Sequence, residues 1–269
     1  MKQATVPSPF PPPLSLPFTW LNPLQDNKIP VIFLHGFMGS ASDWDFISAG
    51  FQGPALAIDL PSHGAATFKL ESASWFEETA LLLRSTMETL GLNKVTLAGY
   101  SLGGRVAMDF ASRFPELVHR LILESSHPGL PTVQEREERI EHDFAWAKRI
   151  ESNWPEVLRD WYDQPVFRNS STGLDELFEL RSRNAPNLLA AALRGFSLGN
   201  QPEYGGLSVP CMYIAGLRDA KYVEIGRVLE AKSSSVLLKL VQGTGHNVHL
   251  ERGDQYLSLL TQFLESDLP

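Results

Sequence analysis

Short apolar runs alternate with longer amphipathic stretches along most of the chain. Six runs, rich in Val, Ile, Leu and Ala and bounded by turn residues, have the length and composition of buried strands. They span 30–34, 55–60, 94–98, 121–124, 209–215 and 236–241. Apolar residues recur with a helical period in 74–90, 102–114, 223–231 and 254–264. This alternation predicts an α/β fold, with a mostly parallel, doubly wound sheet covered by helices on both faces.

The alternation stops between residues 128 and 206. This region holds helical patterns, three of the six tryptophans and no convincing strand. We interpret it as a helical cap inserted after one strand and lying over the carboxyl ends of the strands, where open parallel sheets bind ligands. The predicted organisation is a proline-rich arm over 1–17, a core formed by 18–127 and 207–269, and the cap over 128–206.

Composition narrows the class of protein and its location. The single cysteine, Cys211, lies in an apolar run and predicts a buried, inert thiol. The chain can form no internal disulfide, which fits a reducing compartment, so we expect a cytoplasmic protein. No stretch approaches the roughly 20 apolar residues of a membrane span, and the N-terminal region has no apolar core of a secretory signal.

The net charge of -8 argues against nucleic acid as a partner. Nothing in the residue pattern calls for a metal or another cofactor, and we expect neither. The sequence leaves the oligomeric state open, with a monomer as the simplest expectation. A small molecule is the expected partner.

One short motif predicts a catalytic serine. Gly-Tyr-Ser-Leu-Gly at 99–103 follows an apolar run and opens a helical stretch. Strand, Gly-x-Ser-x-Gly and helix in this order are typical of a strained turn that exposes a serine hydroxyl above a sheet. The two glycines leave room for the close approach of strand and helix. The nucleophile or base would be Ser101.

Two further residues complete a candidate triad. A serine hydroxyl needs a second group to take its proton. Asp219 and His246 follow the last two predicted strands, both in loops at carboxyl ends of strands. The alternative for Asp219 is a cap on the following helix. His249 competes with His246, and Glu124 competes with Asp219 but is less well placed.

Backbone N–H groups near the serine predict an oxyanion hole. An oxyanion needs two preorganised donors. One is expected from Leu102, directly after the serine, and the other from Phe37 in the loop after the first strong strand.

Four motifs together resemble the α/β-hydrolase superfamily: His-Gly-Phe-Met-Gly-Ser at 35–40, Asp-Leu-Pro-Ser-His-Gly at 59–64, the serine motif at 99–104 and Gly-His-Asn at 245–247. A second set at 100–105, 127–130, 160–167, 181–182 and 197–202 resembles one branch. That branch is the 2-succinyl-6-hydroxy-2,4-cyclohexadiene-1-carboxylate synthases of menaquinone and phylloquinone biosynthesis. One departure is Ser62, where relatives commonly have glycine.

The resemblance implies a lyase. Its substrate, 2-succinyl-5-enolpyruvyl-6-hydroxy-3-cyclohexene-1-carboxylate, carries three carboxylates. The enzyme removes a proton alpha to the succinyl carbonyl, and pyruvate leaves. By analogy Ser101 takes this proton, His246 relays it, and Asp219 orients the imidazole. The oxyanion hole would hold an enolate.

The cap supplies candidate anion ligands. It contains eight of the fifteen arginines and one of the eight lysines, although its acidic residues outnumber its basic ones. Arginine suits bidentate binding of carboxylates. Arg181 shares the apolar face of its predicted helix, with a role at the helix C-terminus as the alternative. Arg139 has an exposed ion pair with Glu135 as its alternative, while the resemblance implies that an arginine of this helix binds a substrate carboxylate.

Four more residues are candidates for substrate contact: Tyr100, Arg105, Trp161 and Lys221. Arg105 lies four residues after the serine and either adds positive charge or pairs inside the core. Lys221 lies two residues beyond Asp219. Trp161 either lines the pocket or packs the cap against the core, and the motif match implies contact by Tyr100.

Two other functions compete with the lyase. The first is an ester or carbon–carbon bond hydrolase in which Ser101 is a covalent nucleophile. The second is a non-catalytic binding protein of the same fold, which is disfavoured because such proteins typically lose a triad member.

Overall fold

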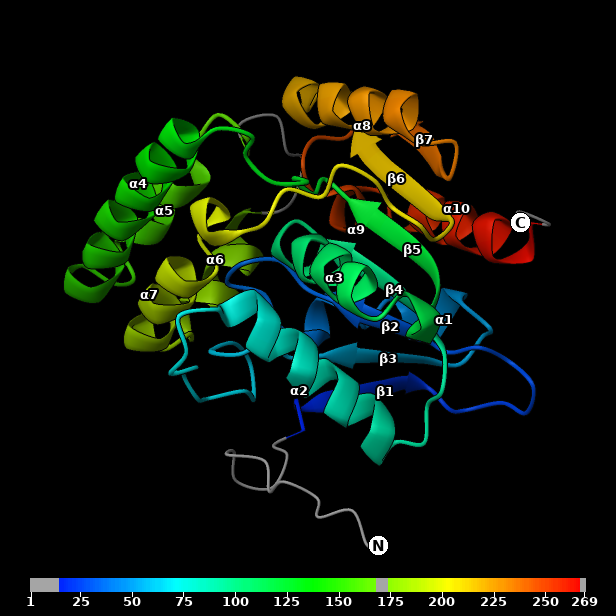
Figure 1. The fold of residues 1–269 in the computed structure, drawn as a ribbon. Helices are drawn as coiled ribbons and strands as arrows, with labels where there is room; N and C mark the ends of the chain where they lie inside the picture. Colours follow the sequence, from blue (N-terminus) through cyan, green and yellow to red (C-terminus); the bar gives the residue numbers. More distant parts are fainter. Residues whose placement is uncertain (1–14, 168–173, 267–269) are drawn as a thin grey trace, which may run out of the picture.

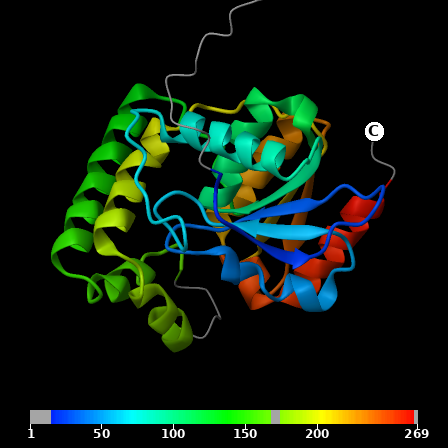
Figure 2. The ribbon, with the colours of Figure 1, turned by 90° about the horizontal axis from the view of Figure 1, so that it is seen from below.

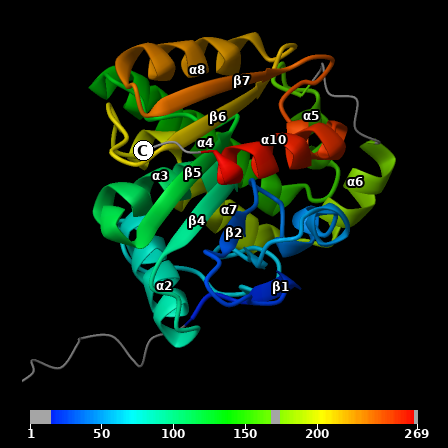
Figure 3. The same ribbon diagram turned by 90° about the vertical axis from the view of Figure 1, so that its right-hand side faces the viewer.

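A single seven-stranded sheet organises the chain. The structure is a computed structural model that describes residues 15–167 and 174–266. The strand order is β1-β3-β2-β4-β5-β6-β7, and every neighbouring pair is parallel except β1 with β3. The strands are β1 (Phe18–Asn22), β2 (Val31–Leu34), β3 (Ala55–Ile58), β4 (Val95–Tyr100), β5 (Val118–Glu124), β6 (Cys211–Gly216) and β7 (Val236–Val241). Figure 3 shows β1 and β7 at opposite margins of the sheet.

The six predicted strands are present, and the α/β class is confirmed. Cys211 is buried as predicted, and burial raises the pKa of its thiol. Strand β1 was not predicted. Its side chains are only partly buried, so it has no continuous apolar run, and its partner β3 begins more than thirty residues further along the chain.

Helices cover both faces of the sheet (Figures 1 and 2). The α-helices are α1 (Ile47–Gly50), α2 (Trp75–Thr89), α3 (Leu102–Arg113), α4 (Val133–Ser152), α5 (Val157–Tyr162), α6 (Leu174–Ser182), α7 (Pro186–Gly195), α8 (Ala220–Lys232), α9 (Val248–Glu251) and α10 (Gly253–Glu265). Short 3-10 helices are η1 (Ala41–Trp44), η2 (Pro115–Leu117) and η3 (Leu198–Asn200).

Alternating side chains of each strand enter two separate cores. In β2, Ile32 and Leu34 pack with the apolar faces of α2, α3 and α8. Val31 and Phe33 point the other way and pack with α1 and α10. All four are buried, so burial of each stabilises the fold by roughly 1.5–3 kcal/mol. A strand that is buried on both faces reads as a continuous apolar run.

Helices α4–α7 form the cap, at the end of the sheet towards which the arrows of β5 and β6 point (Figure 1). Helix α4 begins at a capping box, in which Thr132 and Glu135 satisfy each other's backbone N–H groups. Buried residues of α4, α5 and α7, including Ala147, Leu158 and Leu189, pack with Met38 of the core. The parts of 128–206 that the structure describes contain helices and no strand.

Residues 1–14 of the predicted arm lie outside the described residues, and the division into arm, core and cap at the stated boundaries stays a prediction. Within 15–167 and 174–266, no helix is both long and apolar enough to cross a membrane.

Candidate active site

Ser101 lies in the sharp turn between β4 and α3. Its backbone has φ 50 and ψ -107, a conformation that residues other than glycine rarely adopt. Its N–H donates to the backbone oxygen of Glu124 over 2.9 Å. A Cβ on Gly99 would lie 2.4 Å from the backbone of Gly103, and one on Gly103 would lie 2.1 Å from the backbone oxygen of Leu34. The predicted close approach of strand and helix is confirmed.

His246 and Asp219 form a buried pair. Nδ1 of His246 lies 2.7 Å from Oδ2 of Asp219. Asp219 occupies the N-cap position of α8, yet its side chain makes no capping hydrogen bond. The capping alternative is therefore wrong for this carboxylate, which instead accepts the Nδ1 proton and leaves Nε2 of the imidazole as the basic nitrogen.

Ser101 and His246 line one cavity of about 480 Å³ at the carboxyl ends of the strands. Asp219, Arg139 and Lys221 line the same cavity. No hydrogen bond joins the Ser101 hydroxyl to His246 in this structure. Catalytic hydrogen bonds are often long in unliganded sites and shorten when substrate binds. The structure thus brings the three predicted triad residues to one place.

His249 and Glu124 pair with each other rather than with the triad. Oε1 of Glu124 accepts from the backbone N–H of His249 over 3.1 Å and lies 2.9 Å from its Nδ1. Both side chains are buried. Through its backbone oxygen Glu124 also holds the N–H of Ser101. Glu124 therefore contacts the serine turn and the segment that follows His246, a role that sequence reasoning missed.

The candidate oxyanion donors lie beside the serine. Leu102 begins α3, where the first N–H groups of a helix have no partner inside the helix. Phe37 and Ser101 line a small cavity of about 60 Å³. A Cβ on Gly36 would lie 2.5 Å from the ring of Tyr100, so the loop of Phe37 lies directly against the residue before the serine.

Arg139 lines the larger cavity from α4. Its Nε lies 2.9 Å from both carboxylate oxygens of Asp143. The predicted alternative, an ion pair with Glu135, is wrong, because the carboxylate of Glu135 belongs to the capping box. Lys221 lines the same cavity, and burial, followed by the charge of Arg139, lowers the pKa of Lys221.

Arg105 is held by neutral partners. Its Nε donates to Oε1 of Gln201 over 2.5 Å, and Nη2 donates to the backbone oxygen of Phe196 over 2.6 Å. Burial, and then the charge of Arg139, lower the pKa of Arg105, although a guanidinium stays charged at neutral pH. No carboxylate pairs with it among the described residues, so its positive charge is compensated only at a distance.

Arg181 is buried in a bidentate ion pair with Asp43. Nη1 and Nη2 lie 2.9 and 2.7 Å from the two carboxylate oxygens. Burial alone would lower the pKa of Arg181, but Asp43 and Tyr162 raise it above its usual value. Arg181 therefore joins the cap to the core and also lines the small cavity with Ser101. Arg181 also lies in the last turn of α6, the position that the alternative assumed, and no sequence signal indicated Asp43, 138 residues away.

Each of the two aromatic candidates, Trp161 and Tyr100, lines a cavity and also contacts other side chains of the protein. Trp161 lines both cavities, and its ring also lies 5.0 Å from that of Phe37 and 5.2 Å from that of Trp146. It thus lines the site and packs cap against core. Tyr100 lines the small cavity and donates its hydroxyl hydrogen to Asn247, directly after His246.

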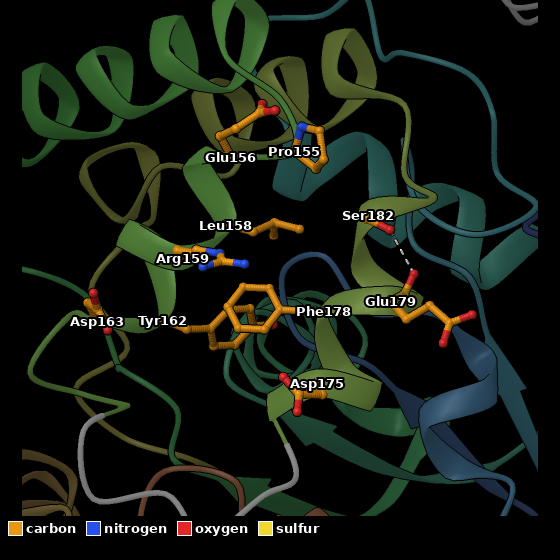
Figure 4. Close-up of a pocket in the computed structure, with 10 residues that line it drawn as sticks. All are labelled: Pro155, Glu156, Leu158, Arg159, Tyr162, Asp163, Asp175, Phe178, Glu179 and Ser182. Atoms are coloured by element: carbon orange, nitrogen blue, oxygen red, sulfur yellow. Dashed lines mark hydrogen bonds between the residues drawn. The ribbon is translucent and has the colours of Figure 1, made fainter.

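A further hollow, larger than these two cavities, lies between α5 and α6 (Figure 4). Its volume is about 690 Å³, and its lining includes four acidic residues and Arg159. An acidic lining repels anions, so this hollow does not suit the expected substrate. Among the residues described by the structure, no three His, Cys, Asp or Glu side chains are grouped to hold a metal ion.

Similarity to known proteins defines the class of protein to which the chain belongs. Residues 31–259 match the alpha/beta hydrolase family. The strand–serine–helix turn and the seven-stranded sheet agree with this match. The chain belongs to the alpha/beta hydrolase family.

Closer relatives define the branch. Proteins named 2-succinyl-6-hydroxy-2,4-cyclohexadiene-1-carboxylate synthase from Klebsiella pneumoniae subsp. pneumoniae and Serratia proteamaculans are 38% and 36% identical to this chain. The alignments cover 91% and 87% of this chain, and 99% and 92% of those proteins. Within the alpha/beta hydrolases, the chain belongs to this synthase family.

Solved structures agree. MenH from S. aureus superposes with a TM-score of 0.86 at 27% identity, covering 92% of this chain and 97% of that one. A thermophilic esterase from Thermogutta terrifontis superposes with a TM-score of 0.74 at 21% identity, covering 93% and 92%. The similarity to the esterase shows only that the two proteins share a fold.

Proposed function

We propose that this protein is a lyase that eliminates pyruvate from 2-succinyl-5-enolpyruvyl-6-hydroxy-3-cyclohexene-1-carboxylate. A base removes the proton from the ring carbon that carries the succinyl group. The electron pair forms a new ring double bond, the existing double bond shifts by one position, and the carbon–oxygen bond to the enolpyruvyl group breaks. Pyruvate leaves as its enolate and takes up a proton, and the ring becomes the 2,4-cyclohexadiene of the product named in the family.

The observation that carries this proposal is a single cavity that is lined both by candidate triad residues and by cationic residues. Ser101 and His246 line this cavity together with the cationic residues Arg139 and Lys221. A substrate with three carboxylates approaching a protein of net charge -8 needs a local positive field. Arg105, which pairs with no carboxylate in the part of the chain that the structure describes, adds to that field.

The triad would act as a base. A serine hydroxyl becomes basic enough to accept a carbon-bound proton only if its own proton passes to another group. His246 takes that proton at Nε2, and Asp219 holds Nδ1 and stabilises the imidazolium that forms. Ser101 thus meets the substrate, while the other two residues act through it.

The enolate that develops on the succinyl carbonyl needs hydrogen-bond donors. The backbone N–H groups of Phe37 and Leu102 are the proposed pair, because Phe37 lines the small cavity with Ser101 and Leu102 directly follows Ser101 at the start of α3. Donors that are fixed in place before reaction stabilise the transition state without reorganisation.

The substrate carboxylates are assigned to the cationic residues. Arg139 and Lys221 would bind from the larger cavity, with Arg105 contributing charge. Arg181 would bind from the smaller cavity through N–H groups not used by Asp43. Tyr100 and Trp161 would contact the apolar parts of the substrate.

Location and organisation complete the proposal. A polar biosynthetic substrate with three negative charges favours the cytoplasm as the site of action. We also propose that the chain acts as a monomer, because Ser101, His246 and the cationic residues all come from one chain. Residues 128–206 would form the cap of this unit.

Serine hydrolysis is the second candidate, because the Asp219–His246 pair and the strained serine turn equally suit a covalent nucleophile. A fluorophosphonate label combined with an ester assay distinguishes the two. Labelling with ester turnover as fast as lyase turnover favours the hydrolase.

The test is to supply the enolpyruvyl substrate and to follow pyruvate release together with growth of the cyclohexadiene absorbance. Wild-type protein is expected to accelerate both at equal rates. Failure of the wild type to accelerate either would overturn the proposal.

A further inference from the structure

The carboxylate of Asp143 holds only one edge of the Arg139 guanidinium. Nε of Arg139 lies 2.9 Å from each carboxylate oxygen. The terminal nitrogens Nη1 and Nη2 donate to no other residue that the structure describes. The Arg139 side chain is 33% exposed, whereas that of Asp143 is 1% exposed. Because Arg139 lines the cavity, the Nη1–Nη2 edge of its guanidinium is left for a ligand, while the Nε edge binds Asp143.

Asp143 is itself fixed from a second direction. The hydroxyl of Ser197 donates to Oδ2 of Asp143 over 2.8 Å, and Ser197 is fully buried. Ser197 precedes η3, which lies close to α4, because a Cβ on Gly199 would be 2.3 Å from the backbone oxygen of Arg136. The carboxylate is thus held between two segments of the cap and cannot follow Arg139 if the arginine turns.

We propose that Asp143 and Ser197 are positioning residues that present the terminal edge of Arg139 to a substrate carboxylate. The inference rests on the proposed function, in which Arg139 binds such a carboxylate. A guanidinium binds a carboxylate with two parallel hydrogen bonds only from one edge at a time. Occupying the Nε edge leaves the Nη1–Nη2 edge, which fixes the direction from which the carboxylate is bound.

Charge and position predict opposite effects. Asp143 is negative and lines the cavity, so its charge alone repels an anionic substrate. If charge were its only influence, Asp143→Asn would tighten substrate binding. If Asp143 positions Arg139, the same change weakens binding, because the arginine is released from its partner.

The chain contains a matched control. Asp109 on α3 is also buried, pairs with the Nε of Arg113 four residues later over 2.7 Å, and accepts the hydroxyl of Tyr204 over 2.5 Å. This trio repeats the arrangement of Asp143, Arg139 and Ser197 but lines none of the cavities described above. The Asp109→Asn variant therefore shows how the loss of such a network affects stability, without a change in the site.

The experiment measures binding of 2-succinylbenzoate, a stable aromatic analogue of the product with two carboxylates, by tryptophan fluorescence. In parallel it measures KM and kcat for pyruvate release. Asp143→Asn is expected to raise Kd and KM about tenfold, with kcat nearly unchanged. Ser197→Ala, which removes only one hydroxyl, is expected to raise them by about threefold. Asp109→Asn is expected to leave both unchanged.

Unchanged or tighter binding by Asp143→Asn overturns the proposal. So does an equal effect of Asp143→Asn in an Arg139→Ala background, where a positioning residue has nothing left to position. If Asp143→Asn does not fold, Ser197→Ala alone decides the outcome. If the wild type releases no pyruvate, the proposed function fails, and the binding series still tests whether Asp143 orients Arg139.

Discussion

The core side and the cap side of the site are held in different ways. On the core side, Ser101, Asp219 and His246 each follow a parallel strand, so the sheet brings them to the same edge. On the cap side, side chains hold side chains: Asp143 holds Arg139, and Asp43 holds Arg181. In the proposed mechanism, the strand ends therefore position the residues that react, whereas ion pairs between side chains position the residues that bind the substrate.

Substitutions on the core side and on the cap side should have different kinetic consequences. In the proposed reaction, the core residues act on the proton that is transferred, so their loss should lower kcat. The cap residues would act on substrate groups that do not react, so their loss should raise KM or destabilise the cap.

Ser101→Ala and His246→Ala should each lower kcat by about a thousandfold or more, because the triad acts as a unit. The double variant should be scarcely slower than either single one. Steady-state pyruvate release checks this, with circular dichroism as the control for folding. A single variant that keeps more than about a tenth of wild-type kcat would contradict the triad assignment.

Arg181→Ala should lower the free energy of unfolding by about 3–5 kcal/mol, because it leaves Asp43 charged, buried and unpaired. Urea denaturation measures this loss. Asp43→Leu combined with Arg181→Leu is the control and should recover much of the stability, since it removes both charges. KM should rise in either variant, and an unchanged KM would exclude Arg181 from substrate binding.

Arg139→Ala should raise KM by roughly tenfold to a hundredfold with little change in kcat, because one charge-assisted bidentate contact is lost. Arg139→Lys keeps the charge but not the fork, so it should restore only part of the affinity. Initial rates over a range of substrate concentrations measure both. A fall in kcat at unchanged KM would place Arg139 with the core residues instead.

Lys221 should make KM sensitive to alkaline pH. Its lowered pKa means that it loses its charge at a lower pH than an ordinary lysine. KM should therefore rise as the pH rises through that pKa, by a few-fold, or about 1 kcal/mol. Lys221→Arg stays charged and should flatten this rise. An identical pH dependence of KM in both proteins would exclude Lys221.

These differences also explain how far the sequence could predict the molecule. Strands buried on both faces appear as apolar runs, and the triad follows them, so the sheet and the placement of Ser101, Asp219 and His246 could be predicted. Pairs between distant segments leave no local pattern. No local sequence pattern indicates the roles of Asp43 and Ser197. The pair of Glu124 with His249 forms only because the fold brings the end of β5 to α9.

The choice between His246 and His249 illustrates the same limit. Both follow β7 within a few residues, and the structure gives each its own carboxylate. Glycines around His246 favoured it correctly as the partner of Asp219. The second pair could not be predicted, because only the folded sheet shows that Glu124 reaches His249.

Substrate deuterated at the ring carbon that carries the succinyl group tests whether Ser101 is a base towards a carbon-bound proton. Single-turnover release of pyruvate should be slower from the deuterated than from the protiated substrate, and no covalent adduct should form on Ser101. Equal rates for the two substrates, with a substrate-derived group trapped on Ser101, would instead show that Ser101 is a covalent nucleophile.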